Sequence, residues 1–465
     1  MKQKMKLLGL SVLSASLLFV SCAQDGFDEE SFESSVTNTQ MTSPNAEDVK
    51  TASSADGSQW IVSWPLVKGA SSFQCTVTNV TDPVNPVILF TDSIIDGCTL
   101  TFPREDDSNY VLDIRTLGNK SVGNTDAEEA TKKSFTSFLP TWKEIPAETD
   151  ISTWLAHNPI PADITDEVCI DLVPGANYTM TSSLDFGTHR VTLRSTTPTQ
   201  PASIKIVGDA SFIIDEGFTM KNLNIDASGS ASHMIVGNKT PAEVNVEGGY
   251  YRVENPIYIK NVKINGLQKR FIHDGNVKYC FKTVIIDDCI IEHTPTEKIQ
   301  FIRMESGFVN DLTIRNSTIW NAGEVSQDYI VQYQNAGRST RAGYISNSIT
   351  VSNCTFYNMA KTEKFGNYDG FKGQECSYFT LTNSILMNTG GKQIIQRFSG
   401  NGKPKPENAK FSNNTLFNYD MDIIEENYPT ESQVLGDPQF TNPTEGDFHI
   451  SGPAAAAGIG DPRWL

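Results

Sequence analysis

An asparagine-centred pattern of apolar and polar positions recurs through the C-terminal two-thirds of the chain. Each copy places an apolar residue, a polar residue and then Asn or Asp, and a second apolar pair follows. The starts of the clearest copies lie 28, 37, 30 and 30 residues apart, and weaker copies begin at Met220 and Val246. A period in this range is typical of a solenoid. The clearest copies are Ile286–His293, Ile314–Asn321, Val351–Asn358, Leu381–Asn388 and Phe411–Asn418.

Each copy predicts a strand, a turn and a second strand. Alternate residues of a strand point to opposite faces, so one face buries Ile, Val, Leu or Phe and the other stays polar. Asn tolerates left-handed backbone in a turn, and its amide can bond to the Asn stacked on the next coil. Helical repeats are disfavoured by the β-branched content and by the absence of a 3.6-residue period. We therefore expect a parallel β-solenoid with a ladder of turn residues at Asp288, Asn316, Asn353, Asn383 and Asn413.

The N-terminus has the features of a secretory signal. Three lysines precede a mostly apolar run from Leu7 to Val20, which is too short to span a membrane as a helix. The sequence Leu17–Cys22 resembles a bacterial lipobox, and this resemblance implies cleavage after residue 21 and lipidation of Cys22. The acidic residues that follow resemble the export signal of surface lipoproteins of Bacteroidetes-type bacteria. The resemblance implies a lipid-anchored protein on the outer face of the outer membrane. The acidic residues are Asp25, Asp28, Glu29 and Glu30.

Composition limits the partners. Residues 22–55 are predicted to be a flexible linker, because they are polar and acidic with few large apolar groups. The formal charge is -18, and removal of residues 1–21 takes away three lysines and changes it to -21. Such a chain is not expected to bind nucleic acid. Seven cysteines remain after Cys22, with no C-x-x-C motif, so neither a disulfide framework nor a zinc site is indicated.

Residues 56–140 show a different pattern, of short alternating strands separated by turns. Trp60–Trp64, Phe73–Thr78 and Tyr110–Arg115 alternate, and Gly69 marks a turn between the first two. This spacing predicts a β-sandwich. The arrangement resembles a fibronectin type III domain. Its tryptophans lie within an alternating strand, so we expect them in the core and not on a sugar-binding surface.

Residues 141–465 resemble the pectate-lyase-like proteins at both ends of the repeat. Val168–Tyr178 is similar to their first coil, and three segments near the C-terminus are similar to the stretch that closes the last coil. The resemblance implies an all-β fold, a right-handed parallel β-helix. Together with the lipobox and the fibronectin-like domain, it resembles surface lipoproteins of polysaccharide utilisation loci. The closing segments are Leu435–Phe440, Gly446–Ile450 and Ser451–Ala455.

The resemblance also implies that a glycan lies across one parallel sheet, on the strand that precedes each Asn turn. We expect four such strands at Gln300–Arg303, Tyr329–Tyr333, Gly370–Gly373 and Gln393–Arg397. Arginine suits a uronate because its planar fork pairs with a carboxylate through two hydrogen bonds. A solvated sheet face balanced by Glu305, Asp369 and Glu375 is the alternative interpretation. The predicted glycan-binding residues are Arg303, Gln332, Tyr333, Lys372 and Arg397.

Two loops are long enough to wall the same face: Gly337–Gly343, with Arg338 and Arg341, and Lys361–Asp369, with Lys364 and Tyr368. The motifs of zinc proteases, nucleophile-elbow hydrolases and phosphate loops are absent. We expect His293 to replace a ladder amide and to have no catalytic role.

Two functions remain open. The first is capture of an acidic polysaccharide such as pectin, without a cofactor, and delivery to glycan transport machinery. The second is a polysaccharide lyase acting by β-elimination, with Lys372 as the base and Arg303 or Arg397 neutralising the uronate carboxylate. Relatives of the resembled fold also use Ca²⁺ for neutralisation, so a lyase could require Ca²⁺. A structural or adhesin role is the remaining alternative.

Overall fold

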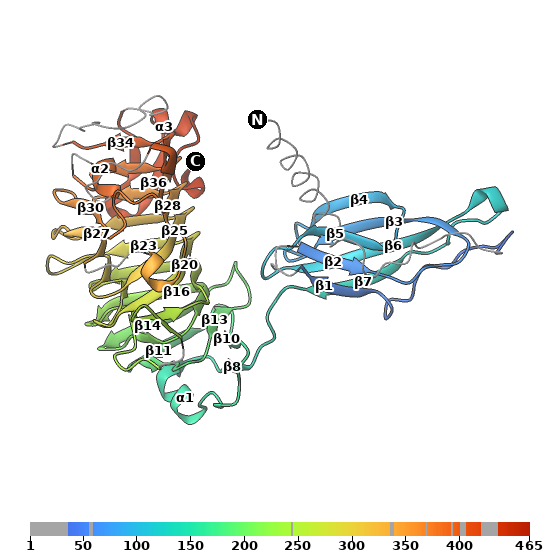
Figure 1. Ribbon diagram of the computed structural model, residues 1–465, viewed down its shortest axis with the longest axis horizontal. Helices are drawn as coiled ribbons and strands as arrows, with labels where there is room; N and C mark the ends of the chain where they lie inside the picture. The colour runs from blue at the N-terminus through green and yellow to red at the C-terminus, as the bar shows by residue number, and fades with distance from the viewer. Residues whose placement is uncertain are drawn as a thin grey trace, which may run out of the picture. The chain divides into compact units, whose positions relative to one another are not determined.

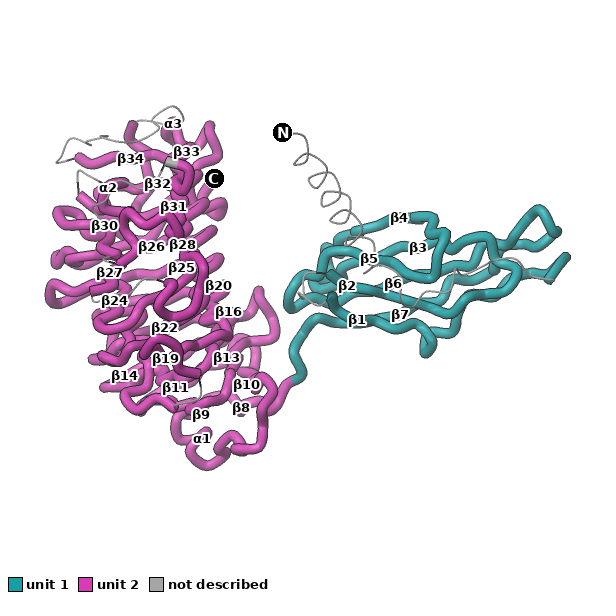
Figure 2. The backbone as a smooth tube through the Cα atoms, viewed as in Figure 1, with its two compact units in different colours: residues 1–140 teal, residues 141–465 magenta. Residues whose placement is uncertain are grey.

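The chain forms two compact units, residues 1–140 and residues 141–465 (Figure 2). The computed structural model describes residues 36–54, 59–242, 245–334, 339–368, 370–391, 394–399, 406–419 and 436–465. The predicted signal peptide, Cys22 and the acidic residues after it lie outside these ranges.

Unit 1 is a β-sandwich of two antiparallel sheets. One sheet has the order β1-β2-β5, and the other has the order β4-β3-β6-β7. Tyr110, at the start of β6, accepts a hydrogen bond from the main-chain N of Glu105, a tyrosine corner typical of such sandwiches. The strands are β1 Lys50–Ser53, β2 Gln59–Ser63, β3 Ala70–Asn79, β4 Val87–Ile95, β5 Thr99–Pro103, β6 Asn109–Gly118 and β7 Thr131–Thr136, with the 3₁₀ helix η1 at Lys120–Val122.

The predicted linker reaches too far into this unit. Residues 36–54 are folded against the sandwich: β1 pairs with β2, and Met41 and Val49 are buried. The polar composition concealed this strand because none of its four side chains is buried. Trp60 and Trp64 are buried in the sandwich core, as predicted.

Unit 2 is a parallel β-helix, which confirms the predicted fold class. Its coils stack from β8 at one end to β34 at the other (Figure 1). We number its three parallel faces as sheets 1, 2 and 3. Sheets 1 and 2 are continuous through β16 (Phe218–Ser230) and β20 (Ile257–Leu267), which run across the corner between them.

Sheet 1 contains the strand that directly precedes each Asn turn, and sheet 2 contains the strand that follows it. Sheet 1 holds β8 Lys143–Ile145, β10 Val168–Leu172, β13 Val191–Ser195, β19 Tyr250–Val253, β22 Tyr279–Asp287, β25 Phe308–Arg315, β28 Asn347–Ser352, β31 Ser377–Thr382 and β33 Ala409–Ser412. Sheet 2 holds β9 Thr149–Asp150, β11 Asn177–Met180, β14 Ala202–Gly208, β23 Ile290–His293, β26 Thr318–Asn321, β29 Thr355–Tyr357, β32 Ile385–Met387 and β34 Thr415–Phe417.

Sheet 3 precedes sheet 1 on each coil, and its strands are short. They are β12 Leu184–Asp185, β15 Phe212–Ile214, β17 Ile235–Gly237, β21 Ile272–His273, β24 Ile302–Met304, β27 Tyr329–Tyr333 and β30 Lys364–Asn367. The strands that carry Arg303 and Gln332 belong to this sheet. The expectation that they directly precede the Asn turns is therefore wrong, since sheet 1 lies between.

The turn ladder is confirmed. All five predicted turn residues have positive φ, between 49° and 56°. Asn222 and Asn261 adopt the same backbone, and Asn261 Nδ2 donates to Asn222 Oδ1 at 2.9 Å. The weak copy at Val246 is wrong, because β18 (Val246–Glu247) forms an antiparallel hairpin with β19. The turn of that coil is made by Asn261 instead.

Short elements pack against the β-helix at its first coils and along sheet 2. Helix α1 (Ile151–His157) lies at the first coils, and its N-cap Asp150 accepts from the main-chain N of Thr153. The C-terminal segment packs on sheet 2, where Trp464 Nε1 donates to Thr318 Oγ1 at 2.7 Å. The remaining elements are α2 Ile394–Phe398, α3 Pro453–Ala456, η2 Ser339–Ala342, η3 Pro406–Asn408, η4 Pro443–Glu445, η5 Pro462–Trp464, β35 Phe440–Asn442 and β36 Asp447–Ile450.

Candidate functional site

The outward-facing side chains of sheet 3 form one continuous row. The parallel register aligns one residue from each strand, at the usual spacing of about 4.8 Å between neighbouring strands. The flanking Ile272, Ile302 and Val331 point inward and are buried in the core. This outer row consists of Asp185, Ile213, Val236, His273, Arg303, Gln332 and Asn367.

A second set of polar residues lies on the same coils, each three positions before a residue of the outer row in the sequence. Arg270 is its centre: its guanidinium donates to Gln300 Oε1 at 3.1 and 3.3 Å, and its Nη1 lies 3.2 Å from His233 Nε2. The His233 ring lies beside that of His273, with centroids 4.8 Å apart. We call Arg270, His233, His273 and Arg303 the sheet 3 cluster.

The sheet 3 cluster is rich in positive charge. Burial lowers the pKa of the Arg270 guanidinium, and the charge of Arg303 lowers it further. Arg303 itself is paired with Glu305 at 2.7 Å. In the part of the chain that the structure describes, no carboxylate lies within ion-pair distance of Arg270. The charges of Glu305, Glu297 and Asp274 act on Arg270 from beyond that distance and oppose the lowering of its pKa. An incoming carboxylate would therefore meet a half-buried guanidinium that is not already held in an ion pair.

The two imidazoles of the cluster are neutral at physiological pH. Burial, followed by the charges of His273 and Arg270, lowers the pKa of His233 to about 3. Burial is also the main cause that lowers the pKa of His273. Both ring nitrogens of His233 face N–H groups of Arg270, at 3.3 and 3.2 Å. A neutral imidazole accepts a hydrogen bond at only one nitrogen, so at the other nitrogen two N–H groups face each other. An added hydrogen-bond acceptor at this point would satisfy them.

His273 presents a hydrogen-bond donor beside the contact between His233 and Arg270. Its Nδ1 accepts from the main-chain N of Gly275 at 3.1 Å, so the neutral ring carries its proton on Nε2. His233 and His273 line a surface hollow of about 400 Å³ on sheet 3. The hollow has Ser183, Ser211, Ser232, Asp209, Lys239 and Asn276 among its other lining residues.

Two of the predicted ligands lie together on this face. Arg303 and Gln332 are register partners on β24 and β27, and Arg303 Nη1 donates to Gln332 Oε1. On the neighbouring coils Gln300 Nε2 donates to Asp328 Oδ2, and Lys364 Nζ lies over the Tyr329 ring, 5.4 Å from its centroid. The outer face of β24, β27 and β30 thus carries a network of long polar side chains.

The other three predicted ligands are placed elsewhere. Tyr333 is fully buried, and it packs edge-on against Tyr368 and Phe371 in the core. Its assignment as a sugar-stacking residue is wrong, because alternation along β27 turns it inward once Gln332 faces out. Tyr368, predicted to wall the groove, is buried as well.

Lys372 and Arg397 do not lie on strands of sheet 3. Lys372 lies in a turn between β30 and β31, and Arg397 lies on α2. The strand of the Lys372 coil is β30, which ends at Asn367. The predicted groove of three basic residues on four strands is therefore wrong, and Arg270 and the two histidines stand beside Arg303 instead. Arg338, Asp369 and Gln393, also named in the sequence interpretation, lie outside the described residues.

The sequence carried a signal for Arg270 and His273 that was missed. Arg270 precedes Gln300 by one coil, and His273 precedes Arg303 by the same interval. Arg270 and His273 precede the Asp288 turn as Gln300 and Arg303 precede the Asn316 turn, so a similar spacing marks a sheet 3 strand there. His293 is buried as a structural residue: its Nε2 lies 3.0 Å from the main-chain O of Lys269, and Gln327 contacts its Nδ1 at 2.8 Å.

Among the described residues, no group of three or more His, Cys, Asp or Glu side chains is arranged to hold a metal ion. Asp369 and Glu375 are a carboxylate pair that could be considered for Ca²⁺, but Asp369 lies outside the described residues. The described helices include none that is long and apolar enough to cross a bilayer.

Comparison with known families finds three consecutive matches. Residues 2–173 match DUF4992, residues 176–322 match DUF4957 and residues 349–464 match DUF5123. Each is described as a domain of unknown function. The second of these matches contains the sheet 3 cluster up to Arg303. No curated protein matches the chain.

Proposed function

We propose that this protein is a lipid-anchored outer-membrane surface protein that binds an acidic, uronate-containing polysaccharide along sheet 3. The observation that carries the proposal is Arg270. It is a half-buried guanidinium that forms no ion pair among the described residues, and its neighbours His233 and His273 line an open hollow.

The geometry of the row suits a linear polymer. Successive strands present side chains at about 4.8 Å intervals along the β-helix, so a chain laid across sheet 3 meets a new set of contacts on each coil. The Arg270 fork can pair with a uronate carboxylate, and His273 Nε2 can donate to a hydroxyl or carboxylate oxygen. Gln332 and Asn367 continue the row with neutral donors and acceptors suited to sugar hydroxyls.

The surrounding protein supports capture at a cell surface. The lipobox-like Leu17–Cys22 supplies the anchor, and unit 1 supplies a folded spacer between the anchor and the β-helix. Captured glycan would then be passed to transport machinery in the same membrane. A formal charge of -18 disfavours nucleic acid as the natural polyanion.

A polysaccharide lyase is the second candidate. The neutral imidazoles of His233 and His273 beside two arginines favour it, because β-elimination needs an unprotonated base near the group that neutralises the carboxylate. Lys372 is no longer a candidate for that base. The pKa of about 3 makes His233 a weak base at neutral pH, so capture is the better supported function.

The test uses the soluble chain from residue 23 with pectins, alginate, glycosaminoglycans and neutral glycans, with and without Ca²⁺. Retardation on native gels measures binding, and ultraviolet absorbance of the unsaturated product measures elimination. Binding of one acidic glycan without new absorbance or new reducing ends supports capture. Rising absorbance would establish the lyase, and absence of binding to every glycan would refute both.

A further inference from the structure

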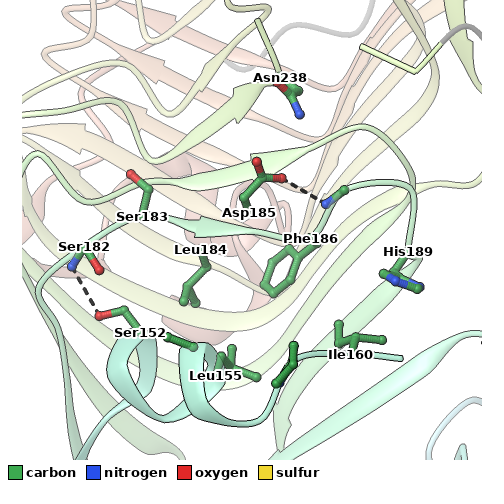
Figure 3. Close-up of a pocket in the computed structure, with 13 residues that line it drawn as sticks. Ser152, Leu155, Ile160, Ser182, Ser183, Leu184, Asp185, Phe186, His189 and Asn238 are labelled. Carbon is green, nitrogen blue, oxygen red and sulfur yellow. Dashed lines mark hydrogen bonds between the residues drawn. The ribbon is translucent and has the colours of Figure 1, made fainter. Parts of the chain in front are cut away.

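A second hollow, of about 570 Å³, lies at the first coils of the β-helix between α1 and β12 (Figure 3). Leu184 and Phe186 are buried in the core and point from the β12 segment toward Leu155 of α1 and toward Ile160 in the segment after it, both of which are partly buried. The rim is polar and consists of Ser152, Ser182, Ser183, Asp185, His189 and Asn238.

This hollow continues the face that carries the sheet 3 cluster. Ser183 lines both hollows, and Asp185 belongs to the same outer row as His273. Three strand steps separate Asp185 from His273, which is about 14 Å at the usual strand spacing. A short run of sugar units that contacts Arg270 can therefore reach the hollow beside α1.

The charge along the outer row changes from positive at the sheet 3 cluster to negative at the end near α1. Asp185 is exposed and points away from α1, and its Oδ1 accepts from the main-chain N of Gly187 at 2.9 Å. Asp209 lines the hollow between Asp185 and the cluster. The pKa of nearby Asp215 is raised, mainly by burial, and the charge of Asp185 contributes. A uronate carboxylate would be repelled at this end, whereas it is attracted at Arg270.

We propose that the hollow between α1 and β12 is a subsite for a neutral sugar that carries an apolar group, such as the methyl of a 6-deoxy sugar. The glycan that fills the whole face then combines uronate units with neutral deoxy or acylated units, and it is not a uniform polyuronate. This inference rests on the proposed binding of uronate at the sheet 3 cluster.

The test compares two oligosaccharides of equal length by calorimetric titration of the soluble chain. One alternates galacturonate with the 6-deoxy sugar rhamnose, and the other contains galacturonate alone. We expect the alternating oligosaccharide to bind more tightly by at least about fourfold, the factor that burial of one methyl group supplies.

Two substitutions examine the origin of that preference. Asp185→Asn keeps the acceptor for Gly187 and removes the charge, so the affinity for the galacturonate oligomer should rise by about two- to fivefold and the preference should shrink. Ile160→Ser removes apolar lining and should reduce the preference by weakening the alternating oligosaccharide. Thermal unfolding of each variant confirms that the fold is kept.

The outcomes separate the inference from the proposed function. Equal affinities for the two oligosaccharides in the wild type and in both variants would overturn the subsite and leave uronate binding at Arg270 standing. Failure of both oligosaccharides and of every other acidic glycan to bind would overturn the proposed function, and the subsite with it.

Discussion

Replacing Arg270 by Gln removes a half-buried cation beside sheet 3 that forms no ion pair among the described residues. Loss of a buried charge that pairs with a ligand charge costs about 2–5 kcal/mol of binding free energy. Because Arg270 is only partly buried, we expect the lower part of this range, about 2–3 kcal/mol. This corresponds to a loss in affinity of about 30- to 150-fold.

The same substitution should change stability little. It removes the donors to Gln300 Oε1, worth about 1 kcal/mol. It also removes the repulsion between Arg270 and Arg303 together with the opposing attraction of Glu305, Glu297 and Asp274. Calorimetric titration with an oligogalacturonate measures the affinity, and denaturant unfolding measures the stability. Arg315→Gln is the matched control, since Arg315 lies on sheet 1 and pairs with Asp287 at 2.8 Å. If Arg270→Gln binds the glycan with unchanged affinity, Arg270 is not the cation that pairs with the uronate carboxylate.

Three further outcomes follow from the side-chain environments. Tyr333→Phe should leave glycan affinity unchanged in the same titration. It should raise the free energy of unfolding by about 1 kcal/mol, because the buried hydroxyl has no hydrogen-bond partner among the described residues. Loss of glycan binding in this variant would show that Tyr333 is a glycan-binding residue. Lys372→Gln combined with Arg397→Gln should keep affinity within about twofold, the range of surface charge effects, in the same titration; a larger loss would restore the three-cation groove. Burial lowers the pKa of His293 to about 3, so the neutral imidazole contributes fully to stability above about pH 6.5 and this contribution is lost as pH falls toward 3. Denaturant unfolding should show the free energy of unfolding declining over this range. His293→Gln should make the decline between pH 6.5 and 5 smaller.

The coil architecture could be predicted because it depends on local backbone chemistry. Each turn needs a left-handed residue, and Asn or Asp meets that need at Asp288, Asn316, Asn353, Asn383 and Asn413. Apolar residues on either side of each turn then indicate strands with one buried face. Both signals lie within a few residues of each other, so they are visible without knowledge of the tertiary structure.

The site was predicted only in part, because sheet 3 has weak local signals. Its strands span two to five residues, and loops of unequal length separate them from the Asn turns. The pair Ile394 and Ile395 fits a short strand or a helix equally well, and tertiary packing makes it part of α2. Arg270 had no local signal of its own, because the strand beside it, β21, spans only Ile272–His273 and shows no alternating run.

The most direct test of glycan capture on sheet 3 is hydrogen–deuterium exchange of the soluble chain with and without a saturating acidic oligosaccharide. We expect slower exchange at the main-chain amides of β17, β21, β24 and β27 and of the loops beside them, with little change in unit 1 or on sheet 1. Protection confined to unit 1 or to sheet 1, while the oligosaccharide is demonstrably bound, would contradict the assignment of the site.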